Sequence, residues 1–506
     1  MRSPEPSIAD SNLRSSDFHL DLSTPLQYYP SHAAKLGDAA LAIIGEGSEQ
    51  REITEEEDRR VLKRVDRWLM PIVLLVYFLQ QLDKSSLSYT SVFGVVGETV
   101  SVNVFMWGTV VACTAAAHEF KGLMAARFFL GLFEASVAPA FITITQMWWR
   151  RREQTVRLAM WMAMNGVTAM VGSLLSWGLG HISGSLKSYQ TIFLFIGLLT
   201  VVCAPIVVYA LFFLVLPDSP TKARFLSLDE KVIALERLRA NNQGTESKVW
   251  KWDHVWEVLF DVKTYLWFSL LFLCCVPSGG ISAFGPLIIQ GFGFDETDPK
   301  SILFNIPFGF FQVVVTLLSA LISTKVKLKW PIIFALTIPP VAGVTTLLKL
   351  GRDPEDRGAL LSCYYVLSVF TGIQPMLYSW SAQNTAGHTK KLCTTGLVFV
   401  AQCAGNIVGP LLYRTDEKPR YHRGLVANLI CWVTLAVMTG VTAVYLTYLN
   451  KRHEAARLRV GKIVKVVDRS LELYKARDKR RRGEAQNEQA FDDLTDLKNE
   501  DFIYVL

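Results

Sequence analysis

The chain has 506 residues, of which 51% are hydrophobic and 19% are charged, and it carries a formal net charge of +7. This composition is more apolar and less charged than that of a typical soluble protein, which excludes an ordinary soluble fold. The basic residues form short clusters beside apolar runs rather than one basic face, so nucleic acid is not an expected partner.

Apolar runs of membrane-spanning length recur along the chain. A helix needs about 20 mostly apolar residues to cross the hydrocarbon layer, and about 11 runs qualify. We expect spans at 68–90, 102–117, 122–149, 157–180, 191–215, 264–290, 302–324, 330–350, 359–381, 393–413 and 424–449. The sequence therefore predicts an all-α integral membrane protein embedded in a lipid bilayer.

Clusters of Lys and Arg predict which loops face the cytoplasm, because short cytoplasmic loops are enriched in these residues. Clear clusters are Arg150 to Arg152, the lysines at 325, 327 and 329, and the pair Lys390 and Lys391. The N-tail (1–67) and the C-tail (450–506) also place basic residues next to the spans. We therefore expect both tails in the cytoplasm, and the plasma membrane is the expected location.

The spans form two groups on either side of a charged cytoplasmic loop at 216–262. The N-terminal group covers 68–215 and the C-terminal group covers 263–449. Two pseudo-symmetric halves of about six helices each, with a substrate site between them, are the layout of major facilitator transporters. The C-terminal group shows six spans, but the N-terminal group shows five.

The orientation of the N-terminal group locates the missing span. The span at 68–90 starts inside, and the span at 122–149 ends inside at the three arginines, so an even number of crossings must lie between them. The run at 102–117 supplies one crossing. Residues 91–101 are too short for another at about 1.5 Å per residue, and Glu98 interrupts them.

Two charged residues lie inside the span at 122–149, where charges are costly and need a reason. Arg127 and Glu134 are seven residues apart, so they project from nearly the same helix face. A guanidinium matches a planar carboxylate, which makes Arg127 a candidate anchor for an anionic substrate and Glu134 a candidate proton carrier. The alternative is a structural ion pair between helices.

Uncharged polar residues inside the spans are further candidates for substrate binding. Gln374 and Tyr378 lie four residues apart around Pro375, where a kink exposes backbone carbonyls, and Asn165 lies within another span. For each of these residues the alternative is a hydrogen bond that joins two helices. Gly405 and Gly409 form a GxxxG pattern, which predicts close contact with a neighbouring helix.

The sequence contains no motif that indicates catalysis or metal binding. The cysteines all lie in apolar segments without CxxC spacing, the histidines are scattered, and no hydrolase or nucleotide-binding motif occurs. We therefore expect a protein that is not an enzyme, with no metal site, no cofactor and no evident protein partner.

Several segments resemble the fungal anion:cation symporters, the allantoate permease group of the major facilitator superfamily. They are LDKSSLSYTSVFG (Leu82 to Gly94), ARFFLGLFEASVAPAFITITQMWWRRREQTVR (Ala126 to Arg157), LPDSPTKARFLSLDEK (Leu216 to Lys231), NTAGHTKK (Asn384 to Lys391), AGNIVGPLL (Ala404 to Leu412) and DLTDLKNEDFIYVL (493–506). The chain departs from this family after Gly94, where the second helix and its loops are absent.

The resemblance implies a site as well as a fold. The charged positions of the family's fourth helix match Arg127 and Glu134, and its proton-coupling acid-base pair resembles Asp83 and Lys84. We expect substrate contacts from Arg127, Lys84, Gln374, Tyr378 and Asn165, and proton coupling by Asp83 and Glu134. A snorkelling pair at the membrane rim is the alternative for Asp83 and Lys84.

The sequence thus predicts proton-coupled symport of a small organic anion by alternating access, with the proton gradient as the energy source. Allantoate, a ureido acid, a vitamin or another carboxylate satisfies this prediction. The alternative is a transport-incompetent sensor, or a nonfunctional product that lacks one helix.

Overall fold

The computed structural model describes residues 54–84, 110, 113, 120–134, 137–180, 188–209, 223, 225–239, 241, 250–290, 303–351, 354–417, 420–459, 461 and 493–506. Within these ranges the regular structure is helical, without a strand. Residues 91–101, where the sequence places the missing crossing, and most of the span at 102–117 lie outside them.

The first described helix, α2 (Glu55–Lys84), runs without a break from a charged stretch into the first apolar span. Its start is fixed by a capping box. The Glu57 backbone N–H donates to Thr54 Oγ1, and the Thr54 N–H donates to the Glu57 carboxylate. The charged stretch from Glu55 to Arg67 therefore continues directly into the apolar span, because nothing between them stops the helix.

The N-terminal half, as we use the term, comprises α2 and five further helices. These are α4 (Phe120–Glu134), α5 (Val137–Trp148), α6 (Arg151–Met162), α7 (Met164–Gly180) and α8 (Ser188–Tyr209). The predicted span at 122–149 thus corresponds to two helices, and the helical run from Arg151 to Leu179 extends the span at 157–180.

Two helices, α9 (Leu228–Arg239) and α10 (Trp252–Phe260), lie in the central loop. The C-terminal half comprises α11 (Val262–Gln290), α12 (Asn305–Val326), α13 (Trp330–Lys349), α14 (Arg357–Leu367), the 3-10 turn η6 (Ser368–Gly372), α15 (Ile373–Gln383), α16 (His388–Leu411) and α17 (His422–Arg459). Among the described residues, seven helical stretches are long and apolar enough to cross a membrane.

Close contact between α11 and α16 depends on glycine, as the GxxxG pattern predicts. A Cβ on Gly405 would lie 2.8 Å from the Phe272 carbonyl oxygen, and one on Gly409 would lie 2.2 Å from that of Val276. Any side chain at either position would push the two helix backbones apart. These two helices form the largest contact within the C-terminal half.

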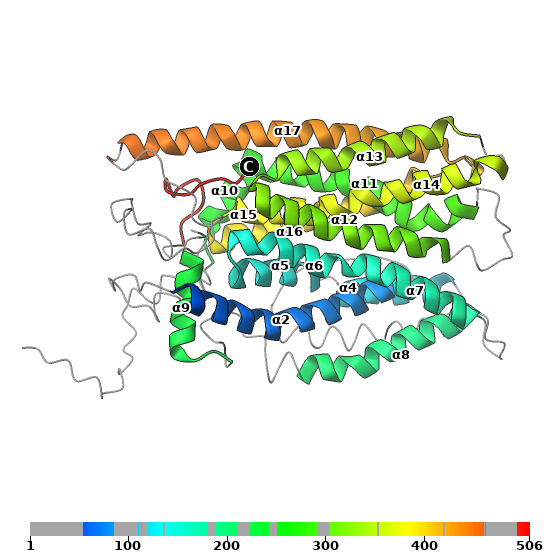
Figure 1. The fold of residues 1–506 in the computed structure, drawn as a ribbon, viewed down its shortest axis with the longest axis horizontal. Helices are drawn as coiled ribbons and strands as arrows, with labels where there is room; N and C mark the ends of the chain where they lie inside the picture. The colour runs from blue at the N-terminus through cyan, green and yellow to red at the C-terminus, as the bar shows by residue number, and fades with distance from the viewer. Residues whose placement is uncertain are drawn as a thin grey trace, which may run out of the picture.

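The two halves meet along α12, which lies against α7 and α6, while α15 contacts α6 and α16 contacts α5. Figure 1 shows the long helices side by side, with α9, α10 and residues 493–506 gathered at one end of the bundle, on the left. We call this the tail end. The start of α2 lies at the same end, where Asp58 pairs with Arg150, the residue just before α6, at 3.1 Å.

Candidate functional site

A polar cluster in the C-terminal half contains two of the residues that the sequence selects. The Tyr378 hydroxyl of α15 donates a hydrogen bond to Gln402 Oε1 of α16. The Gln374 side chain, one helical turn before Tyr378, is a second hydrogen-bond partner of that hydroxyl. The Tyr378–Gln402 hydrogen bond therefore joins two helices, and Gln374 enlarges this polar cluster around the buried Tyr378.

A second polar cluster lies in the N-terminal half, around Asn165 of α7. Its Nδ2 donates to the Tyr77 hydroxyl of α2 at 3.4 Å. Tyr77 packs on Trp161 of α6, and α6 contacts α15, which carries Tyr378, so the two clusters lie in neighbouring parts of the two halves. We call Tyr77, Asn165, Gln374, Tyr378 and Gln402 the central cluster.

Trp161 of α6 lies beside the central cluster with its polar atom unused. Its ring meets Tyr77 edge to face, with centroids 4.7 Å apart, and the residue is 1% exposed. Within the described part of the chain its indole N–H has no hydrogen-bond partner. A buried donor without an acceptor costs free energy, which a ligand oxygen would recover.

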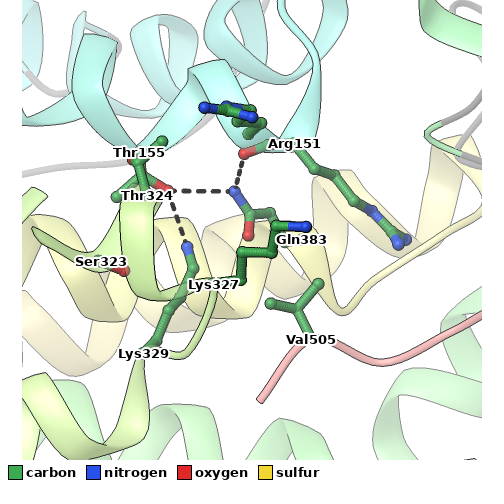
Figure 2. A pocket seen from close by; sticks show the side chains of 9 residues that line it. Arg151, Thr155, Ser323, Thr324, Lys327, Lys329, Gln383 and Val505 are labelled. Carbon is green, nitrogen blue, oxygen red and sulfur yellow. Dashed lines mark hydrogen bonds between the residues drawn. The ribbon is translucent and has the colours of Figure 1, made fainter. Parts of the chain in front are cut away.

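The halves are also joined by polar contacts at the tail end. Thr155 Oγ1 lies 2.7 Å from Ser379 Oγ, and Gln383 Nε2 donates to the Arg151 carbonyl oxygen at 2.5 Å. Lys329, just before α13, donates from Nζ to Thr155 Oγ1 at 3.0 Å and also contacts Ser379. Figure 2 shows Thr155 of one half and Lys329 and Gln383 of the other converging on one another. We call Arg151, Thr155, Lys329, Ser379 and Gln383 the tail-end contact.

Lys329 is 3% exposed, and the acceptors of its ammonium group are hydroxyls. Burial, together with the nearby positive charge of Arg151, holds the pKa of Lys329 well below the usual lysine value. The small pocket beside it is lined by further cations, Arg152 and Lys327, and by no carboxylate among its described residues. The tail-end contact therefore closes most easily around a neutral Lys329.

The charged candidates lie on described helices, but their side chains are outside the described residues. Asp83 and Lys84 end α2, and Arg127 and Glu134 lie in α4. Their roles in substrate binding and proton coupling stay predictions.

Sequence reasoning missed Tyr77, Trp161 and the members of the tail-end contact. It used Arg151 and Lys329 only as marks of the cytoplasmic side, since clustered basic residues at span ends carry that meaning. The spacing of Thr155 and Ser379 gives no signal, because their 2.7 Å contact joins positions 224 residues apart. Within the described ranges, no group of three or more His, Cys, Asp or Glu residues is placed to hold a metal ion.

Comparisons with known proteins cover most of the chain. Residues 85–410 match the family described as Major Facilitator Superfamily. An uncharacterized transporter of Schizosaccharomyces pombe is 33% identical, over 89% of this chain and 88% of its own length. The allantoate permease of Saccharomyces cerevisiae is 26% identical, over 93% of this chain and 90% of its own length.

A solved structure has the same fold. The structure of a bacterial homolog of the human lysosomal transporter Spinster, in an inward-facing and occupied conformation, aligns with a TM-score of 0.50 at 10% sequence identity. The alignment covers 75% of this chain and 97% of that structure. Together with the helical architecture, it confirms the fold class that the sequence predicts.

Proposed function

The chain belongs to the major facilitator superfamily, and on this premise we propose that it carries a small organic anion across the membrane together with protons. Members of this superfamily are transporters rather than enzymes. The proposed energy source is the proton gradient. The proposed location is the plasma membrane, with both tails in the cytoplasm and no obligate protein partner.

The central cluster is the observation that carries the proposal. Alternating access needs a site between the halves whose groups come from both. Tyr77 and Asn165 come from one half and Tyr378 and Gln402 from the other, and α6, whose Trp161 packs on Tyr77, contacts α15, which carries Tyr378. A ligand between them would contact both halves, which favours a rocking carrier over a channel.

The tail-end contact supports the same mechanism. Its hydroxyl and amide hydrogen bonds join α6 to α15 beyond the central cluster, so they close one side of the site. Hydrogen bonds of this kind contribute about 1 kcal/mol each, so the contact can form and break in every cycle.

Substrate class and coupling rest on the charged residues. Arg127 and Lys84 would bind the carboxylate of the anion, while Asp83 or Glu134 would take up a proton and so cancel a buried charge before the loaded carrier turns. The allantoate permease among the relatives carries, by its name, an anion of this class.

Uptake of labelled allantoate in yeast cells that lack their own permease tests the proposal. Uptake should exceed that of empty-vector cells and rise in acidic medium. Tyr378→Phe should reduce uptake several-fold, whereas Tyr448→Phe, which removes the hydroxyl of an exposed tyrosine on α17, should leave uptake unchanged. Equal effects of the two substitutions would contradict a role for the central cluster.

The role of Arg127 as the substrate anchor and the coupling of transport to protons have separate tests. Arg127→Ala should abolish uptake while the protein still reaches the cell surface, and undiminished uptake would refute the anchor. A rate of uptake that does not depend on outside pH would refute proton coupling and leave the rest of the proposal in place.

A second candidate function rests on the span parity of the sequence. A chain that lacks one crossing in the N-terminal group would leave a half or a tail inverted, and such a protein would act as a sensor or have no function. The transcript across residues 90–102 discriminates between the two. An insertion of about 45 residues there, the length of a span with its loops, would restore the symporter.

A further inference from the structure

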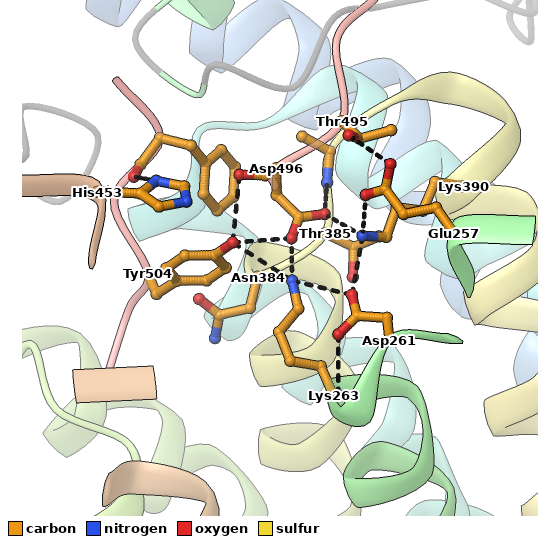
Figure 3. Close-up of polar contacts among 12 residues, drawn as sticks. Glu257, Asp261, Lys263, Asn384, Thr385, Lys390, His453, Thr495, Asp496 and Tyr504 are labelled. Carbon is orange, nitrogen blue, oxygen red and sulfur yellow. Dashed lines mark hydrogen bonds and ion pairs between the residues drawn. The ribbon is translucent and has the colours of Figure 1, made fainter. Parts of the chain in front are cut away.

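Residues 493–506, which we call the strap, lie in a groove at the tail end between α10, α11, α16 and α17. The strap is anchored by Asp496, which is 0% exposed. Its carboxylate pairs with Lys263 of α11 and with Lys390 of α16 (3.0 Å), and it accepts a hydrogen bond from the Tyr504 hydroxyl at 3.0 Å. Figure 3 shows this network of opposite charges from three segments.

The network sets the two lysines, Lys263 and Lys390, against three carboxylates, and such pairing is necessary for buried ions. Lys390 also pairs with Glu257 of α10 (2.7 Å) and with Asp261 (2.9 Å). Burial would raise the pKa of Asp261, but the ammonium groups of Lys263 and Lys390 outweigh burial and hold that pKa below its usual value. Asp496 of the strap therefore binds two lysines that are also held by carboxylates of the helices themselves.

Side chains of α17 satisfy the backbone of the strap. The Phe502 carbonyl oxygen lies 3.0 Å from His453 Nδ1, and Arg457 Nη1 donates to the Glu500 carbonyl oxygen at 2.7 Å. Asn450 hydrogen-bonds both the N–H and the carbonyl of Tyr504, at 2.8 and 2.9 Å. A chain without its own secondary structure needs such partners when it is buried, so this segment is firmly held.

The strap then reaches the interface between the halves. Val505 exchanges two hydrogen bonds with the Asn384 side chain, at 2.7 and 3.0 Å. The Leu506 carbonyl oxygen accepts from the Lys329 N–H at 2.6 Å. The end of the strap therefore lies beside the tail-end contact and is bound to the C-terminal half throughout.

One side chain of the other half holds the strap. Arg151 of α6 donates from Nη1 to the Ile503 carbonyl oxygen at 3.0 Å, and its guanidinium carbon lies 4.4 Å from the centroid of the Phe502 ring. The Arg151 backbone serves different partners, Asn241 and Gln383. Substitution of its side chain therefore removes the strap contact and spares those two hydrogen bonds.

We propose that the strap clamps the tail end closed. The strap is anchored on the C-terminal half and binds Arg151 of the N-terminal half. This contact must break whenever the two halves separate at the tail end. The anchors to α11, α16 and α17 far outnumber the bonds to Arg151, so the strap stays with the C-terminal half and the Arg151 contact separates. The clamp adds to the tail-end contact and favours the conformation closed at that end.

Distance measurement between spin labels tests the clamp without relying on transport. Labels replace the exposed Arg60 of α2 and Arg452 of α17, one on each half near the tail end, in a protein without other cysteines. Phe502→Ala should shift the population ratio of closed to open by about 2- to 30-fold toward open, the range for a cation–π contact. Phe502→Tyr, which keeps a ring, should retain the closed population.

Two further variants make the result decisive. Lys498→Ala changes an exposed position of the same strap and should leave the ratio unchanged. Arg151→Gln should shift the ratio as Phe502→Ala does, and the double variant should add little to either. A wild-type ratio in both single variants, or fully additive shifts, would overturn the clamp. Because the protein is measured without substrate, failure of the transport proposal would not affect this outcome.

Discussion

Trp161 is buried although its indole ring carries a polar N–H group. It packs against Tyr77 and Phe141 as an apolar ring would, yet its indole N–H finds no acceptor within the described part of the chain. Lys329 presents a similar mismatch, because its ammonium group is enclosed by hydroxyls and lies near a cation. Both residues are understandable if the protein has another state, loaded with ligand or opened at the tail end.

Trp161→Phe should weaken substrate binding, because the ring stays and the donor is lost. We expect the KM for uptake to rise about fivefold, the equivalent of one hydrogen bond of about 1 kcal/mol. The melting temperature should hardly change. Trp432→Phe is the matched control, since Trp432 is also buried and its indole N–H has no partner among the described residues, but its ring packs on Phe370. Equal KM changes in the two variants would refute the role of Trp161.

Lys329 should make stability depend on pH. Above the usual lysine pKa the side chain is neutral in the folded and unfolded states alike. As the pH falls below about 10, the solvated lysine gains a proton that the buried one does not, so the folded state loses stability. The melting temperature should therefore rise as the pH increases toward the usual lysine pKa.

Lys329→Met should flatten this rise, which amounts to at most about 1.4 kcal/mol per pH unit. Lys325→Met, at an exposed position nearby, should keep the wild-type slope. Thermal unfolding of the purified protein measures both, and an unchanged slope in Lys329→Met would show that this lysine is charged when buried.

At the scale of elements, glycine decides which helices approach closely. The contact of α11 with α16 brings backbone against backbone at Gly405 and Gly409. A similar crossing joins the halves, where a Cβ on Gly166 of α7 would lie 2.4 Å from the Gly309 carbonyl oxygen of α12. Small residues allow such approaches in membranes, where dispersion and not the hydrophobic effect holds helices together.

Gly409→Ala should therefore destabilise the protein by about 1 to 3 kcal/mol, because the new methyl group meets the backbone of α11. Gly396→Ala is the control on the same helix, since a Cβ there meets nothing within 4 Å. It should be neutral or mildly stabilising, as alanine favours helix by about 1 kcal/mol over glycine. Denaturation in detergent compares the two, and equal stability would contradict the packing argument.

At the scale of the whole molecule, one end of the bundle gathers segments from the entire chain. The start of α2, the junction of α5 with α6, the central loop and the strap all meet there. Arg237 of α9 joins them by pairing with Asp58 of α2 and with Glu153 of α6 (2.9 Å). The start of α2 and the strap thus lie at the same end of the bundle, and the shared cytoplasmic side of the two tails stays a prediction from the basic clusters of the sequence.

Epitope tags on the N-tail and the C-tail should consequently be protected from external protease in intact cells and should become accessible together after permeabilisation. A tag in the loop around Phe294 to Asp298, whose acidic residues favour an outside position, supplies the positive control. Cleavage of the N-tail in intact cells, with the C-tail protected, would contradict the shared side and favour the second candidate function.

The sequence by itself determined the membrane fold, the grouping of the spans and the family. The length of the apolar runs and the position of the basic clusters are local properties, and they determine directly how a chain inserts into a bilayer. Segments such as 126–157 carry the resemblance to the family. It also selected Gln374, Tyr378 and Asn165, since uncharged polar residues in apolar spans stand out. Only the tertiary structure brought Tyr77 to Asn165, Thr155 to Ser379 and Arg151 to the strap. These contacts join positions far apart in the chain, and their geometry depends on how whole helices pack.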